Sequence, residues 1–224
     1  MLHSKFNKKT EKISGILDLL QSDLRKTIIS GLANSTNTDV DKTSSALTMG
    51  MPVLMKALER NAKSSGGAEG LLNAISNKHD GSILNNIGGL LSSGATSQLG
   101  ADGSKILGHI LGSKQNGVVN IISQKVGLDS GSVAQILQIA APILMGFLGK
   151  EKRSQNVSNA SDLTGLLGGL LTNNSSNNEQ SFLEQVLDAD GDGSMVDDVA
   201  GMLLGGSKKS SGLGGMLGGL LEGK

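Results

Sequence analysis

The chain has 224 residues, and its 20 acidic side chains balance its 20 lysines and arginines, so the formal net charge is zero. It contains no cysteine, tryptophan or tyrosine. Disulfides, thiol nucleophiles and cysteine zinc sites are therefore excluded. Nucleic-acid binding is not expected either, because it needs a basic face or aromatic stacking platforms.

The apolar residues available for a core are Leu, Ile, Val, Met and Ala, with three phenylalanines. Leu and Met lose little rotamer freedom in helices and Ala loses none, so this composition predicts an all-α fold. The N-terminus lacks the apolar run and cleavage site of a secretory signal, and no apolar run approaches the ~20 residues of a membrane span. We therefore expect a cytoplasmic protein.

Two stretches of the chain share one pattern of apolar residues at helical spacing. Residues 1–12 are a polar, basic tail, and the pattern follows in residues 13–63 and again in residues 103–150, shifted by 90 positions. We expect two related three-helix units that pack into one helical domain. In the first unit the predicted helices cover 13–24, about 28–32, and 39–58.

The third helix of each unit has the clearest sequence signals. Asp39 and Asp129 occupy matching positions, where a side-chain oxygen can cap the first turn of a helix. Pro52 and Pro142 also match. The stretch after Asp129 is apolar on well over one side, which predicts a buried helix.

A connector is predicted between the two units, in residues 64–102, with short helices at 68–75 and 83–91. The tripeptide Asp-Gly-Ser occurs at 80–82 and again at 102–104. We interpret both copies as turns that start a helix. The second unit is accordingly expected to begin at residue 103.

The last third of the chain is more polar and richer in glycine. Residues 151–180 are predicted to form a polar linker with a short helix at 163–171, and residues 181–204 a helix–loop–helix. Glycine and leucine dominate residues 205–224. We expect this last segment to be a flexible tail.

The stretch with the most definite chemistry is an aspartate-rich loop at 188–198, DADGDGSMVDD. Asp188, Asp190 and Asp192, with the glycine that follows, match positions 1, 3, 5 and 6 of an EF-hand calcium loop. Alternating carboxylates converge on one point, and Ser194 offers a backbone carbonyl to a hard cation such as Ca²⁺. The sequence therefore predicts a cation site here.

The loop departs from the EF-hand pattern at its twelfth position, which is Val199 instead of a bidentate glutamate. Asp197 or Asp198 supplies the closing ligand if the exiting helix starts early. Calcium is the preferred interpretation. Magnesium and a solvated acidic turn that binds no ion are the alternatives.

No catalytic constellation is evident, and we expect no enzyme activity. His109 has no acidic residue, cysteine or second histidine three or four positions away, so we interpret it as a packing or helix-terminus residue. His3 lies in the tail and His79 in a turn. No serine has a G-x-S-x-G setting, and no glycine-rich segment has the residues of a P-loop.

Three stretches together resemble a bacterial family of unknown function, domain-of-unknown-function family 937. They are GSKILGHILG at 103–112, ISQKVGLDSGSVAQILQIAAPILMGFLGK at 122–150, and DADGDGSMVDDVAGML at 188–203. The resemblance covers roughly residues 13–203. It implies a small helical fold with no assigned enzyme activity, and it carries over no catalytic residue.

These observations predict a non-enzymatic interaction or assembly protein whose C-terminal region is ordered by calcium. The expected partner is a second copy of the chain or another protein. The alternative is a peripheral membrane protein that uses residues 205–224, because small residues let apolar helices approach one another or a membrane closely.

Overall fold

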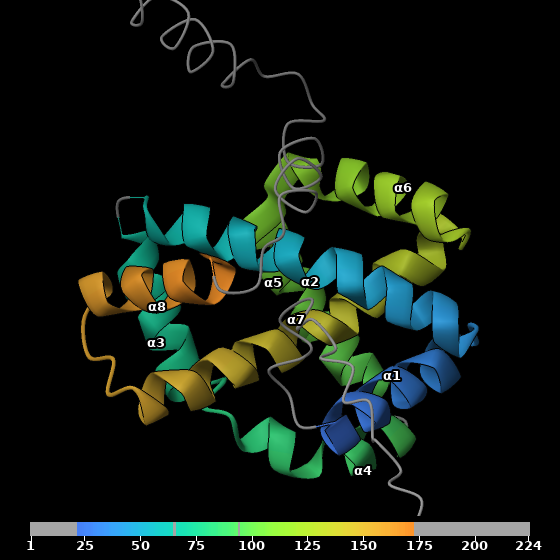
Figure 1. Ribbon diagram of the computed structural model, residues 1–224, viewed down its shortest axis with the longest axis horizontal. Helices are drawn as coiled ribbons and strands as arrows, with labels where there is room; N and C mark the ends of the chain where they lie inside the picture. Colours follow the sequence, from blue (N-terminus) through green and yellow to red (C-terminus); the bar gives the residue numbers. More distant parts are fainter. Residues whose placement is uncertain (1–21, 65, 94, 173–224) are drawn as a thin grey trace, which may run out of the picture. The chain divides into compact units, whose positions relative to one another are not determined.

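The structure is a computed structural model that describes residues 22–64, 66–93 and 95–172 (Figure 1). Every regular element in these ranges is a helix, as the composition predicts. The α-helices are α1 (Ser22–Thr36), α2 (Val40–Ala62), α3 (Gly67–Asn77), α4 (Ile87–Ser92), α5 (Thr96–Leu111), α6 (Gln115–Val126), α7 (Ser130–Ser154) and α8 (Ala160–Thr172), and the 3-10 helices are η2 (Ser82–Asn86) and η3 (Gly112–Lys114). They form one all-α domain. The basic tail, the helix–loop–helix and the Gly/Leu-rich tail expected from the sequence lie outside the described residues.

The turn between α1 and α2 has the same backbone hydrogen bond as the turn between α6 and α7, 90 positions later. The N–H of Thr38 donates to the carbonyl of Ala33 at 2.9 Å, and the N–H of Leu128 donates to the carbonyl of Ser123 at 3.3 Å. This bond satisfies a carbonyl at the end of each helix. The shared bond is consistent with the relation between the two units that the sequence predicts.

Each of these turns contains one residue with a left-handed backbone. Asn37 has a φ of 51° and Gly127 a φ of 66°. Glycine and asparagine tolerate this conformation best, and helices commonly end on such a residue. The Lys42 ammonium donates to the Gly127 carbonyl at 2.9 Å, so the two turns lie side by side in the domain.

Both predicted helix caps are confirmed. The Asp39 carboxylate accepts hydrogen bonds from the N–H groups of Asp41 and Lys42 at 2.9 and 3.0 Å. The Asp129 carboxylate accepts one from the N–H of Ser132 at 2.9 Å. These N–H groups belong to the first turn, where no carbonyl of the helix is available to them. The sequence therefore placed the starts of α2 and α7 correctly.

The central helix of the domain is α7, against which α1, α2, α3, α5 and α6 all pack (Figure 1). Every residue from Ile139 to Gly149 is buried. A helix that is covered on all sides over several turns is a core helix. The buried helix predicted after Asp129 is confirmed.

Within the described residues, α7 is also the one helix long and apolar enough to cross a membrane. The sequence pattern had predicted no apolar run of that kind. However, 72% of its most apolar window is buried inside the domain. Packing against the other helices therefore accounts for the apolar composition of α7 without a membrane.

Two predicted helix boundaries are wrong. The predicted break between residues 24 and 28 is absent: α1 is one continuous helix from Ser22 to Thr36. The tripeptide at 102–104 does not start a helix but lies inside α5, which runs from Thr96. A Cβ atom at Gly103 would overlap the carbonyl oxygen of Gln138 in α7. Glycine thus lets α5 lie directly against the α7 backbone, and this packing offsets its helix cost of about 1 kcal/mol.

The other Asp-Gly-Ser tripeptide is a turn that starts a helix, as predicted. Gly81 has a φ of 96°, and η2 begins at the next residue. The Asp80 carboxylate accepts a hydrogen bond from the N–H of Ser82 at 3.0 Å. The predicted short helices at 68–75 and 163–171 are confirmed as parts of α3 and α8, whereas 83–91 divides into η2 and α4.

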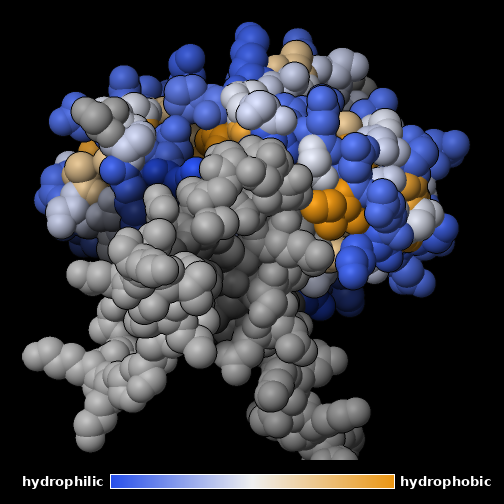
Figure 2. All heavy atoms as spheres, turned by 90° about the horizontal axis from the view of Figure 1, so that it is seen from above, coloured by the Kyte–Doolittle hydropathy of each residue, from blue (hydrophilic) through white to orange (hydrophobic). Residues whose placement is uncertain are grey.

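Most of the coloured residues in Figure 2 are hydrophilic, and the hydrophobic residues visible among them occur in separate patches. Among the described residues, Val40 is the one large hydrophobic residue that is exposed. Scattered apolar residues are normal on soluble domains and need no partner. A binding surface is therefore to be sought in a cavity and not on an apolar face.

Candidate ligand-binding pocket

A pocket of about 460 Å³ lies between α3 and α5. Both helices pack against α2 and α7, which form the floor of the pocket. Small-molecule sites in proteins usually have volumes of about 300–1,000 Å³ and mostly apolar walls with a few polar groups. The pocket has this size, and its walls divide into an apolar and a polar set.

The apolar set forms the floor and the facing walls of the pocket. Its members come from four helices, and the most deeply buried are Leu58 of α2, Leu71 of α3 and Met145 of α7. Ala74 of α3 and Ile106 and Ile110 of α5 complete it. A methionine at the floor suits such a site, because its flexible thioether adapts to an irregular neighbour.

The polar set lies mainly along one face of α5. Asp102, Lys105 and His109 are three and four positions apart, so they follow one another on successive turns of the helix. Lys105 and His109 are exposed, whereas Asp102 is partly covered. Lys78 lines the pocket from the end of α3. The pocket therefore joins an apolar floor to several charged or polar groups.

His79 is the most deeply buried polar residue of the pocket. It is 9% exposed, and its N–H donates to the Ala74 carbonyl at 3.0 Å, which ties it to the end of α3. On the other side its carbonyl touches Gly149 of α7, where a Cβ atom would overlap it. These contacts fix the main chain of His79, and its imidazole Nε2 lies 3.6 Å from Oδ2 of Asp102.

Burial lowers the pKa of His79 below its ordinary value because the low-dielectric surroundings disfavour the charged form. The Asp102 carboxylate opposes this effect, and the positive charge of Lys78 adds to it. His79 is therefore neutral at pH 7, and the pocket's fixed charges at that pH are those of Lys78, Lys105 and Asp102.

The depressed pKa of His79 predicts a pH dependence of stability. The unfolded chain binds a proton at this histidine near pH 6.5, whereas the folded domain resists it, so the free energy of unfolding falls as the pH is lowered from 7 to 5.5. One such group contributes at most about 1.4 kcal/mol per pH unit. Urea titrations across this range should give a smaller slope of the free energy of unfolding against pH for His79→Gln than for the parent chain.

The carboxylates with lowered pKa values act in a different pH window. The pKa values of Asp80 and Asp129 are lowered by hydrogen bonds from serine, so these groups lose their stabilising contribution only below about pH 4.

Asp102→Asn should steepen the slope between pH 7 and 5.5, because it removes the charge that favours His79 protonation. An identical slope in the parent chain, His79→Gln and Asp102→Asn would contradict the assignment to His79.

The pocket holds no arrangement for nucleophilic catalysis of the serine or cysteine kind. None of its lining residues is a serine, threonine or cysteine, so the His79–Asp102 pair has no hydroxyl or thiol beside it to activate. In the ranges that the structure describes, no three histidine, aspartate or glutamate side chains stand together as metal ligands.

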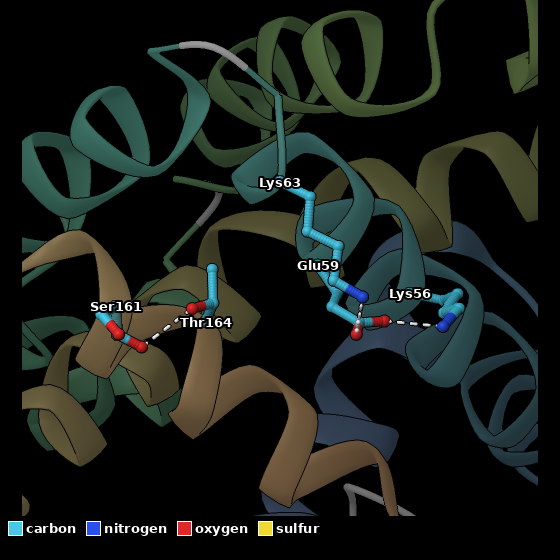
Figure 3. A network of polar contacts seen from close by, with 5 residues as sticks. All are labelled: Lys56, Glu59, Lys63, Ser161 and Thr164. Atoms are coloured by element: carbon cyan, nitrogen blue, oxygen red, sulfur yellow. Dashed lines mark hydrogen bonds and ion pairs between the residues drawn. The ribbon is translucent and has the colours of Figure 1, made fainter.

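A second polar cluster lies on α2, where Glu59 accepts hydrogen bonds from Lys56 and Lys63 at 2.7 Å each (Figure 3). Burial raises the pKa of Glu59, but the two lysine hydrogen bonds lower it more, so its pKa lies below the usual value. Thr164 and Ser161 of α8 appear beside this cluster in Figure 3, joined to each other by their own hydrogen bond. The Glu59 carboxylate already has two cationic partners, so we assign the cluster to helix stability.

The family model described as "Bacterial protein of unknown function (DUF937)" matches residues 18–151 and 152–224 of this chain. The chain belongs to the DUF937 family. The resemblance noted from the sequence is thereby confirmed. No curated protein and no solved structure shows a significant match.

Membership of DUF937 assigns no activity, so the support for each predicted site comes from the residues of this chain alone. The candidate calcium ligands Asp188, Asp190, Asp192, Ser194, Asp197 and Asp198 lie outside the described residues. Calcium binding stays a prediction, as does membrane association through residues 205–224. Neither is needed to explain the α3–α5 pocket.

Sequence reasoning missed this pocket in the DUF937 chain. His109 was expected to be a packing or helix-terminus residue, and it is in the last turn of α5 but exposed. Only residues three or four positions from His109 were considered as its helical partners, whereas Asp102 lies seven positions away on the same face of the helix. That spacing was the available signal, and His79 could be added only by the fold.

Proposed function

We propose that this protein is a non-enzymatic interaction protein and that the α3–α5 pocket is its binding site. The observation that carries this proposal is an apolar floor, with Met145 and Leu58 nearly fully buried, beneath a mouth that bears charged groups. An apolar group that enters the pocket would gain about 25 cal/mol for each Å² of apolar surface, its own and that of the pocket walls, that it removes from water.

The absence of a serine, threonine or cysteine nucleophile from the pocket walls favours binding over covalent catalysis. The rigid placement of His79 between α3 and α7 also favours a preformed site, which binds with a smaller loss of conformational entropy. The sequence-based expectation of an interaction protein is retained, with the pocket as its working part.

The test is a titration of the full chain with 1-octanol, a neutral apolar probe, followed by NMR of ¹³C-labelled methionine methyl groups. Met145 should show a saturable shift, assigned through its loss in Met145→Leu. Ala74→Trp fills the pocket and should abolish the shift, whereas Asn73→Trp, on the neighbouring exposed position of α3, should preserve it.

A variant that adds no bulk provides the check on folding. Ile110→Gln removes one apolar wall and should weaken octanol binding several-fold; because Ile110 also packs against the core, the titration is done at a temperature where circular dichroism shows the variant to be folded. If the Met145 methyl shift is absent for the neutral probe and also for charged probes of the same chain length, the pocket is not a binding site.

A further inference from the structure

We propose that the ligand of the pocket is a small amphiphile with an apolar chain and an anionic head, such as a free carboxylate or phosphate monoester. This inference rests on the proposed function, and it adds the chemical class of the ligand. The argument comes from how the charges of the pocket are placed relative to its apolar floor.

The floor is separated from the charges by depth. Met145 is 3% exposed and Leu58 is 1% exposed, whereas Lys78 and Lys105 are both exposed. A ligand that covers this floor with an apolar chain therefore has its other end beside the lysines. A head group at that position can stay hydrated while it contacts an ammonium group. The ligand's apolar chain is then buried, and its head group stays in water.

The two lysines come from different helices. Lys78 follows the last residue of α3 and Lys105 is in α5, and both line the same pocket. Lysine is a compact, mobile cation with three donors, which suits carboxylate and phosphate oxygens. Two cations at one mouth favour a negatively charged head over a neutral or positive one.

The single carboxylate of the pocket opposes this preference only in part. Asp102 Oδ2 lies 3.6 Å from Nε2 of His79, and the Asp102 side chain is 48% exposed, so water screens part of its charge. His109, the remaining titratable residue of the wall, carries no negative charge in any form. With Lys78 and Lys105 against Asp102, the fixed charge around the mouth is net positive.

The experiment compares three probes with equal chains, all below their critical micelle concentrations: octanoate, 1-octanol and octyltrimethylammonium. The readout is the Met145 methyl shift in the full chain. Octanoate should bind more tightly than octanol because its carboxylate can pair with two lysines. The gain should be only about tenfold, because each exposed ion pair contributes little. Octyltrimethylammonium should bind more weakly than octanol. Octyl phosphate should behave as octanoate does, which tests whether the site distinguishes the two anionic heads.

The charge variants test the assignment of residues. Lys78→Gln/Lys105→Gln should bring octanoate affinity down to that of octanol without changing octanol affinity. The matched control Lys26→Gln/Lys125→Gln removes two exposed lysines that do not line the pocket, so it should change neither. Asp102→Asn should tighten octanoate binding, which a loss of folding cannot imitate.

The outcomes separate this inference from the proposed function. If octanoate and octanol bind equally and the lysine variants change nothing, the anionic head is overturned while the pocket stands as an apolar site. If no probe shifts Met145, both proposals fail. Preference for octanoate that disappears with Lys78 and Lys105 supports both.

Discussion

Gly103→Ala is expected to destabilise the domain by more than about 3 kcal/mol, because the added methyl group would overlap the Gln138 carbonyl oxygen of α7. That oxygen belongs to the backbone of the central helix and cannot rotate away as a side chain can. The two helices must move apart, and the core between α5 and α7 would lose its close packing. Urea denaturation of the full chain, followed by circular dichroism, measures the change.

Gly108→Ala is the matched control in the same helix. A Cβ atom at Gly108 meets nothing within 4 Å, so the methyl group would project into open space. Alanine is favoured over glycine in a helix by up to about 1 kcal/mol, and this variant should be slightly more stable than the parent. Equal effects of the two substitutions would contradict the close contact between α5 and α7.

Asp190→Asn combined with Asp192→Asn is expected to weaken calcium binding on the order of 100-fold, if the loop at 188–198 is a cation site. Each substitution replaces a charged oxygen ligand by a neutral one. Equilibrium dialysis of the full chain against calcium measures the affinity directly, and thermal melts with calcium, magnesium and chelator show whether the ion orders additional helix.

The control for charge is Asp23→Asn combined with Asp41→Asn, two exposed aspartates in α1 and α2. This pair changes the net charge by the same amount, so it should leave calcium affinity intact. Undiminished calcium binding after the loop substitutions would reject the assignment. A parent chain that binds neither cation would reduce the aspartates to a solvated turn.

Local signals in the sequence were sufficient to place the starts of those helices whose first N–H groups are capped by a neighbouring side chain. Asp39 and Asp129 each cap N–H groups two or three residues later in the chain. Such interactions involve only near neighbours, so their residue types reveal them. The all-α class followed equally directly from a core composition dominated by Leu, Ile, Val, Met and Ala.

The start of α5 could not be predicted in this way. Asp102-Gly103-Ser104 has the composition of a turn, and local propensity favours one there. Its helical conformation depends on contact with Gln138 of α7, which is 35 positions after Gly103 in the chain. Tertiary packing therefore overrode a local preference of about 1 kcal/mol.

The pocket was likewise decided by the tertiary structure. Its walls come from residues between Leu58 and Met145, and no single helix carries both its floor and its charged mouth. The sequence by itself determined the all-α class and the capped starts of α2 and α7, because these depend on composition and on neighbours within a few residues. Only the packing of α3 and α5 on α7 brought His79, Asp102 and Lys105 around one cavity, because no interaction between near neighbours in the chain sets those distances.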